Sequence, residues 1–92
     1  MEKKKILVID DDGSVRRYLE VFLSNDYTVL TACDGQKGKE TAITAQPDII
    51  LLDIGLPNLN GFEVCADLKN NIATRTIPIF FVTGTKPEVE SR

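Results

Sequence analysis

Ile6-Leu7-Val8-Ile9 runs directly into Asp10-Asp11-Asp12, and Ile49-Ile50-Leu51-Leu52 runs directly into Asp53. Four consecutive apolar residues are typical of a strand that is covered on both faces of a parallel sheet. Ligands of open parallel sheets bind beyond the carboxyl ends of the strands, so we expect these aspartates to meet in one crevice. Carboxylates gathered that closely repel one another, and raised pKa values or a bound cation relieve the repulsion. An oxygen-binding ion such as Mg²⁺ suits the site.

The length and composition indicate one small globular domain. The chain has 92 residues, of which 42% are hydrophobic and 27% are charged. The net charge of −3 disfavours direct binding to nucleic acid, which needs a basic surface. No apolar run is long enough for a membrane span or a signal peptide, so we expect a cytoplasmic protein.

Apolar patterns alternate between strand and helix along the chain. The expected strands cover residues 5–10, 27–32, 49–52 and 77–83. Between them we expect a helix with Ser14 as its N-cap, a weaker helix over residues 36–45 and a third helix after Gly61. Short connections in such an alternation predict an α/β fold with a parallel sheet and right-handed crossovers.

Two of the expected helices carry apolar residues at helical spacing. The first has them at positions i, i+3, i+4, i+7 and i+8, which form one apolar face: Val15, Tyr18, Leu19, Phe22 and Leu23. The third is expected to turn four side chains inward: Phe62, Cys65, Leu68 and Ile72. Both helices should pack on the sheet through these faces.

The order of these motifs resembles the response-regulator receiver domain of two-component signalling. The resemblance covers nearly the whole chain. It rests on Asp10-Asp11 after the first strand, on Asp53-Ile54-Gly55-Leu56-Pro57 with Gly61 soon after, and on Thr83-Gly84 after the last strand. It implies a flavodoxin-like, three-layer parallel sheet with strand order 2-1-3-4 and a site between the first and third strands. Residues 1–92 would form a receiver domain that lacks the helix after the fourth strand, the fifth strand and the fifth helix.

The resemblance also implies a function and the roles of the site residues. Asp53 would be the phosphoacceptor, which takes a phosphoryl group from a sensor histidine kinase or a phosphotransfer protein and switches an output. Asp11, Asp53 and the backbone carbonyl of Gly55 would hold Mg²⁺, and Asp10 would act on the ion through water. Thr83 would donate its hydroxyl to a phosphoryl oxygen. Such a domain is a phosphoacceptor rather than an enzyme, although it would catalyse its own phosphoryl transfer.

The chain departs from the family where a lysine is expected. Family members end their fifth strand in a lysine that contacts the phosphoryl group, and nothing in residues 1–92 stands at that position. Lys86-Pro87 imitates the family's Lys-Pro pair but lies too close to Thr83. This departure keeps a second class of function open, a receiver-like scaffold or interaction module that does not switch. It also leaves Ile79-Phe80-Phe81-Val82 as an exposed apolar edge strand, through which two copies could associate.

A third alternative is a haloacid-dehalogenase-type phosphatase. Residues 6–15 resemble the nucleophile motif of that family, with Asp10 as the nucleophile and Asp12 as the acid/base. Against this alternative, the helical pattern begins at Ser14 and leaves no room for a flap, and the family's downstream acidic metal motif is absent. The loop after Asp53 would also have no role. The receiver domain is therefore the preferred interpretation.

Overall fold

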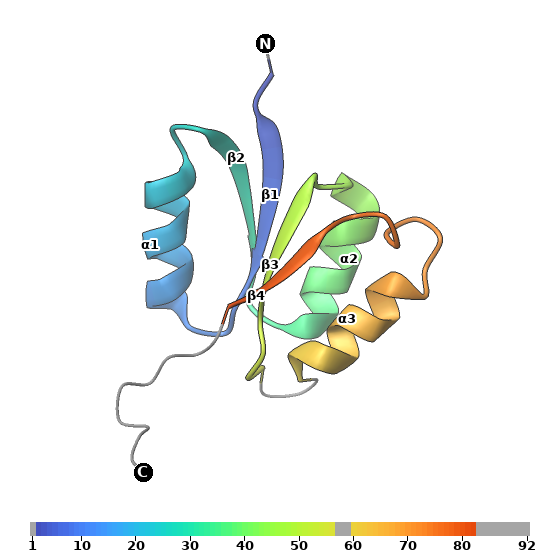
Figure 1. Cartoon of the computed structure of the whole chain (residues 1–92). Helices are drawn as coiled ribbons and strands as arrows, with labels where there is room; N and C mark the ends of the chain where they lie inside the picture. Colours follow the sequence, from blue (N-terminus) through green and yellow to red (C-terminus); the bar gives the residue numbers. More distant parts are fainter. Residues whose placement is uncertain (1, 57–59, 83–92) are drawn as a thin grey trace.

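The computed structural model describes residues 2–56 and 60–82, and within them strands and helices alternate as the sequence predicts (Figure 1). The strands are β1 (Lys4–Ile9), β2 (Tyr27–Ala32), β3 (Ile49–Asp53) and β4 (Ile79–Val82). The helices are α1 (Gly13–Leu23), α2 (Gly35–Ala45) and α3 (Gly61–Lys69). None of the helices in these two ranges has the length and apolar character needed to span a membrane.

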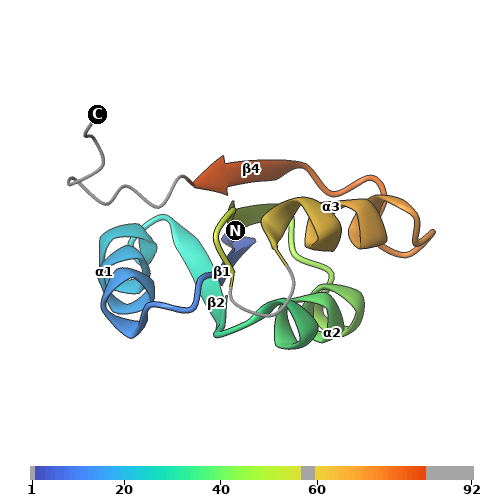
Figure 2. The ribbon, with the colours of Figure 1, turned by 90° about the horizontal axis from the view of Figure 1, so that it is seen from below.

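The strands form one parallel sheet in the order β2-β1-β3-β4. β1 and β3 are therefore the central strands of the described sheet, and β2 and β4 lie at its edges. α1 covers one face, whereas α2 and α3 cover the other, which gives three layers (Figure 1 and Figure 2). This arrangement confirms the flavodoxin-like α/β fold and the strand order 2-1-3-4.

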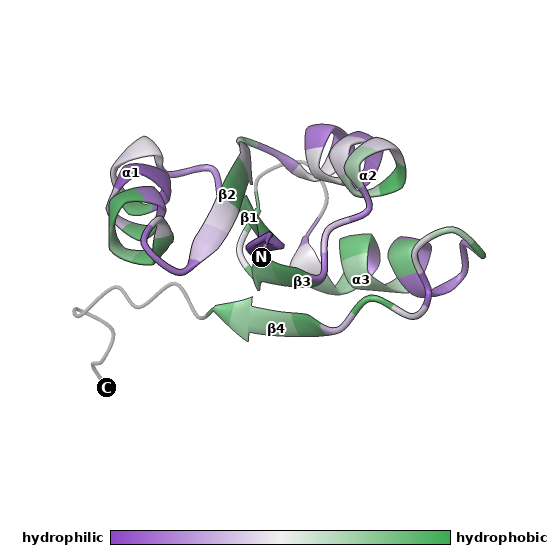
Figure 3. Ribbon diagram, turned by 90° about the horizontal axis from the view of Figure 1, so that it is seen from above, coloured by the Kyte–Doolittle hydropathy of each residue, from purple (hydrophilic) through white to green (hydrophobic). Residues whose placement is uncertain are grey.

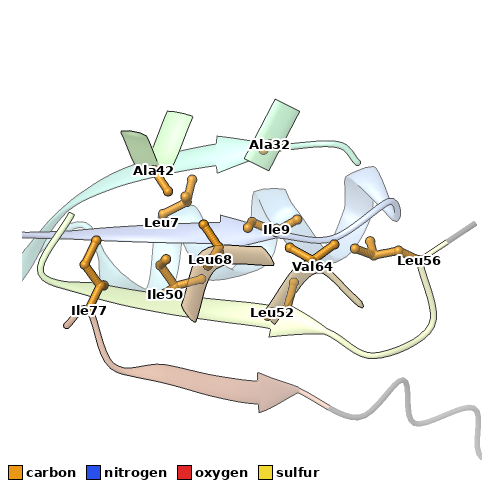
Figure 4. Close-up of a cluster of buried hydrophobic side chains, with 10 residues drawn as sticks. All are labelled: Leu7, Ile9, Ala32, Ala42, Ile50, Leu52, Leu56, Val64, Leu68 and Ile77. Carbon is orange, nitrogen blue, oxygen red and sulfur yellow. The ribbon is translucent and has the colours of Figure 1, made fainter. Parts of the chain in front are cut away.

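Both central strands are largely buried on both faces, which explains their uninterrupted apolar sequences. The last four residues of β1 are all buried. Leu7 and Ile9 of this strand belong to one core cluster with Ile50 and Leu52 of β3, and side chains from β2, α2, α3 and the connecting segments also belong to it (Figure 4). α2 approaches it so closely that a Cβ atom on Gly38 would lie 2.5 Å from Cδ1 of Ile9. Glycine at this position lets the helix touch the sheet.

α1 covers its face of the sheet only in part. Val15, Leu19 and Leu23 are half-buried, and no residue of this helix is fully buried. Tyr18 and Phe22, which the periodicity assigns to the same apolar face, are 64% and 65% exposed. Their rings stack on each other, with centroids 5.9 Å apart. The apolar face of the helix is thus wider than the surface that the described part of the sheet offers it.

α3 turns inward only part of the face that the sequence predicts, and Cys65 packs against the core as expected. Val64 and Leu68 are buried, but Phe62 is 59% exposed and Ile72 is 81% exposed. The helix ends at Lys69, so Ile72 follows it and does not continue its inner face. The inward orientations predicted for Phe62 and Ile72 are therefore wrong.

β4 is an apolar strand at the edge of the described sheet (Figure 3). It pairs with β3, and among the described residues no strand pairs with its other edge. Phe80 is 57% exposed, whereas Phe81 packs against Phe62 of α3 with ring centroids 5.1 Å apart. The strand begins at Ile79, two residues later than predicted, because Pro78 has no N–H to donate to a neighbouring strand. The described residues thus confirm an apolar edge strand.

Candidate functional site

Three aspartates gather at the carboxyl ends of β1 and β3. Ile9 and Leu52 are register partners in the parallel pairing of these strands, so the residues that follow them, Asp10 and Asp53, are neighbours at the end of the sheet. Asp11 comes next along the chain, and ligand oxygens of the three carboxylates lie within 4.8 Å of one another. Asp10 and Asp53 are each 7% exposed, whereas Asp11 is exposed. The structure therefore brings together the carboxylates that the two apolar runs predict.

Backbone N–H groups hold one oxygen of each buried carboxylate. The N–H of Asp12 donates to Oδ1 of Asp10 over 2.9 Å, and the N–H of Gly55 donates to Oδ1 of Asp53 over 3.0 Å. In both cases an aspartate accepts the N–H two residues further on, as in an Asx-turn. Within the described residues, the second oxygen of each carboxylate has no hydrogen-bond partner. Each carboxylate is thus fixed in direction and keeps one oxygen for a ligand.

The negative charge of Asp10 is unfavourable in this site. Burial is the main cause that raises the pKa of this carboxyl above its ordinary value, and the N–H of Asp12 acts in the opposite direction. The negative charges of Asp53, Asp11 and Asp12 raise the pKa as well. A cation among the carboxylates would remove this cost, and carboxylate oxygens are ligands that Mg²⁺ takes in proteins. The donor set therefore fits Mg²⁺.

Asp12 has a structural role, because its side chain caps α1. Oδ1 of Asp12 accepts the N–H of Ser14 over 2.8 Å and the N–H of Val15 over 3.4 Å. The N-cap is thus Asp12 and not Ser14, since the carboxylate upstream reaches the free N–H groups of the first turn. This geometry disfavours the phosphatase alternative, in which Asp12 would need its carboxylate for acid/base chemistry. α1 also begins at Gly13, which leaves no room for a flap.

The first residue of α3 packs directly on the loop that follows β3. A Cβ atom on Gly61 would lie 2.5 Å from the carbonyl oxygen of Asp53 and 2.7 Å from Cα of Ile54. The N–H of Gly61 donates to the carbonyl of Ile54 over 2.8 Å. Asn60 caps the helix by accepting the N–H of Glu63 over 3.0 Å. These contacts fix the backbone of Asp53 from the side of the helix.

The remaining predicted site residues are Gly55 and Thr83. Gly55 is exposed in the loop after Asp53, where its N–H already binds the carboxylate. Thr83 lies outside the described residues, as does Lys86. Val82, the last described residue of β4, is the register partner of Asp53. The described site therefore consists of the three aspartates and Gly55.

Arg16 is a candidate that the sequence pattern does not reveal. Its Nη1 donates to the carbonyl oxygen of Asp10 over 2.9 Å. The only signal for it in the sequence is a basic residue one helical turn after an acidic loop, and such residues are common on helix surfaces. Contact with the acidic loop becomes visible only in three dimensions.

Comparison with known proteins identifies the family. The family model of the response regulator receiver domain matches residues 6–91, and the chain belongs to this family. It is 40% identical over 81 residues to the DNA-binding dual master transcriptional regulator RpaA of Synechocystis sp., and the alignment covers 87% of this chain and 34% of RpaA. The chain spans about a third of the length of RpaA and of similarly sized curated relatives, and 18% of the length of the response regulator PleD of Caulobacter vibrioides.

Solved receiver domains have the same fold. The N-terminal domain of a response regulator receiver protein from Methanoculleus marisnigri JR1 has a TM-score of 0.86 and 31% identity, over 89% of this chain and 68% of that one. The receiver domain of the sensor histidine kinase PA1611 from Pseudomonas aeruginosa PAO1, which has a magnesium ion coordinated in its active site cleft, has a TM-score of 0.81 and 26% identity, over 86% of this chain and 66% of that one. The receiver domain expected from the sequence is thus confirmed, and the chain is a two-component signalling domain.

Proposed function

We propose that this receiver domain accepts a phosphoryl group on Asp53 with the help of Mg²⁺. It would take the group from a sensor histidine kinase or a phosphotransfer protein and switch an output. The observation that carries the proposal is the environment of Asp53. This carboxylate is buried at the end of a central strand, and a ligand oxygen on it lies within 4.8 Å of oxygens on Asp10 and Asp11.

The acidic cluster suits a phosphoacceptor because a carboxylate alone attacks phosphorus slowly. Negative charge on the phosphoryl group repels the nucleophile, and charge neutralisation is the main contribution that a protein can make to this reaction. Mg²⁺, when bound, would supply that neutralisation. In the proposed site, Asp11, Asp53 and the carbonyl of Gly55 would hold the ion directly, and Asp10 would act through water.

The two oxygens of Asp53 have different roles in this proposal. Oδ1 accepts the N–H of Gly55, which sets the direction of the carboxylate, and would also be the oxygen that holds the ion. Oδ2 is the oxygen that attacks the phosphorus atom, so an O–P bond forms while the P–N bond of the donor phosphohistidine breaks. The leaving histidine nitrogen keeps the electron pair of that bond. The product is an aspartyl phosphate on Asp53.

Two finer expectations from the sequence stay predictions. Thr83, as the hydroxyl donor to a phosphoryl oxygen, lies outside the described residues. The cytoplasmic location rests on the sequence alone. Neither is needed for the reaction proposed at Asp53.

We also propose that the outer edge of β4 associates with a second copy of the chain. Phe80 on this strand is 57% exposed, and the described sheet pairs β4 on one side only. An apolar edge strand with unpaired backbone groups favours pairing with another strand. Two copies related by a twofold axis would cover both edges at once.

A phosphorylation assay tests the proposed function. The domain is incubated with acetyl phosphate and Mg²⁺, and its intact mass is measured. We expect one phosphoryl group per chain, which is stable in acid and labile in base, and no adduct in EDTA. Asp53→Asn should abolish the adduct. The matched control is Asp26→Asn, which changes an exposed aspartate next to β2 and should be labelled normally.

The alternatives give different results in the same assay. A scaffold that does not switch would bind Mg²⁺ and remain unlabelled. A phosphatase of the haloacid-dehalogenase type would be labelled on Asp10, so Asp53→Asn would keep the adduct. Either result would overturn the proposal for Asp53.

A further inference from the structure

Arg16 lies where α1 meets the acidic loop. It belongs to the first turns of the helix, and its Nη1 donates to the carbonyl oxygen of Asp10 over 2.9 Å. Its Nη2 lies beside Gly13, where a Cβ atom would be 3.4 Å from this nitrogen. The guanidinium therefore reaches from the helix back across the loop to the end of β1.

This hydrogen bond completes the fixation of Asp10. The N–H of Asp10 donates to the carbonyl of Ala32 in β2 over 3.1 Å, and its carboxylate accepts the N–H of Asp12 over 2.9 Å. The carbonyl is the remaining backbone polar group of a residue that is 7% exposed, and a buried carbonyl without a partner costs free energy. Arg16 supplies that partner.

We propose that Arg16 is a positioning residue of the cation site. The carbonyl that it binds belongs to the peptide group that joins Asp10 to Asp11. Rotation of this peptide group would turn the two carboxylates relative to each other, so a hydrogen bond that holds it also holds their arrangement. Arginine suits this role because its guanidinium is planar and always charged. The identity of the ion as Mg²⁺ rests on the proposed function.

Removal of Arg16 has two opposite effects on cation binding. Loss of a positive charge near three carboxylates would strengthen the binding of a cation. Loss of the hydrogen bond would weaken it, because the loop would no longer hold the carboxylates in place. Removing an outer partner of a metal ligand typically costs about 10-fold to 100-fold in metal affinity, whereas a screened charge near the surface contributes much less. If Arg16 positions the loop, its removal should therefore weaken cation binding, whereas if only its charge matters, its removal should strengthen cation binding.

The experiment compares three variants of the chain. Arg16→Met removes the charge and the hydrogen bond, and Arg16→Lys keeps the charge without the planar guanidinium. Arg17→Met is the matched control, because Arg17 is exposed on the same helix and makes no hydrogen bond to the acidic loop among the described residues. Mg²⁺ affinity is measured by calorimetric titration. Amide hydrogen exchange is measured by NMR in EDTA, so that one result is independent of the metal.

Arg16→Met should weaken Mg²⁺ binding by about 10-fold or more. In EDTA it should speed exchange of the Asp12 N–H, which binds Asp10, and leave exchange of the Gly55 N–H, which binds Asp53, unchanged. Arg16→Lys should show both effects to a smaller degree. Arg17→Met should change neither quantity by more than roughly twofold.

Two results together would overturn the proposal. Arg16→Met would bind Mg²⁺ as tightly as the unmutated chain or more tightly, and its exchange at the Asp12 N–H would be unchanged. If the unmutated chain bound no Mg²⁺, the proposed ion would be wrong. The exchange measurement in EDTA would then decide whether Arg16 holds the loop at Asp10 in place. Faster exchange at Asp12 in Arg16→Met would still support the positioning role. Unchanged exchange at Asp12 would reject it.

Discussion

Gly61 of α3 packs on the backbone of Asp53 so closely that a Cβ atom on Gly61 would lie 2.5 Å from the carbonyl oxygen of Asp53. Real Cβ atoms do not approach an oxygen this closely, so any other residue at position 61 must push the helix and the loop apart. Both partners in this contact are backbone, which cannot change rotamer to make room. The contact therefore ties the position of the proposed phosphoacceptor to the start of α3.

Gly61→Ala should lower the free energy of unfolding by about 1 to 3 kcal/mol, as expected for overpacking. Urea denaturation measures this change. Gly55→Ala is the matched control in the same loop, because a Cβ atom there would meet Oδ1 of Asp53 at an ordinary 3.9 Å. That variant should stay within about 0.5 kcal/mol of the unmutated chain. Equal stabilities of the two variants would contradict the close contact.

Mg²⁺ should raise the thermal stability of the chain, because it binds the folded cluster of carboxylates and not the unfolded chain. At a concentration about ten times the dissociation constant, the ion would add about 1.4 kcal/mol. For a domain of this size this corresponds to about 6 to 11 °C in Tm. Asp11→Asn should abolish the increase, whereas Asp26→Asn should retain it. A Tm that does not respond to millimolar Mg²⁺ in the unmutated chain would contradict the metal site.

Asp10→Asn should stabilise the chain in EDTA at neutral pH. The pKa of Asp10 in the folded chain is raised above 3.8, chiefly by burial. Because the pKa of Asp10 is higher in the folded chain than in the unfolded chain, the protonated carboxyl favours folding at a pH below the unfolded-chain pKa. This contribution to stability is lost as the pH rises through the folded-chain pKa. As the pH rises from acidic to neutral, the Tm of Asp10→Asn should therefore increase relative to the Tm of the unmutated chain. Thermal melts across this range measure it, and a constant difference would exclude an electrostatic cost at Asp10.

The chain should self-associate through β4 as its concentration rises. Exposed large apolar side chains each forfeit about 1.5 to 3 kcal/mol of burial free energy, which association can recover. Light scattering over a concentration series measures the mean mass. Phe80→Lys should reduce association, whereas Ile72→Lys, which changes an apolar residue that is 81% exposed outside the strands, should not. A compact monomer at high concentration would refute this proposal.

The sheet and the acidic cluster are predictable because they depend on local sequence. The uninterrupted apolar run that ends at Ile9 requires burial on both faces, and this selects a central parallel strand. Strand ends in a parallel sheet share one edge, so the two apolar runs place Asp10 and Asp53 at that edge, and the resemblance to receiver domains implies that the two strands are neighbours. Neither step needs long-range information.

The helix faces and the supporting contacts are not predictable in the same way. Apolar periodicity assigns Phe22 to an inner face, but it does not state how much sheet surface is available to cover that face. α3 begins at Gly61 in close contact with the backbone of Asp53, and this contact joins two elements of the fold. The hydrogen bond from Arg16 to the carbonyl of Asp10 likewise depends on how α1 is oriented against the end of β1. These features follow from tertiary packing and not from local pattern.

Residue-level mapping of the phosphoryl group tests the central claim most directly. After incubation with acetyl phosphate and Mg²⁺, the chain is reduced with borohydride, which converts an aspartyl phosphate to homoserine, and its peptides are sequenced by mass spectrometry. Homoserine should be found at position 53, only when both phosphodonor and Mg²⁺ were present, with Asp10 and Asp11 unchanged. Homoserine at position 10, or no conversion in a chain that binds Mg²⁺, would contradict the assignment of Asp53 as the phosphoacceptor.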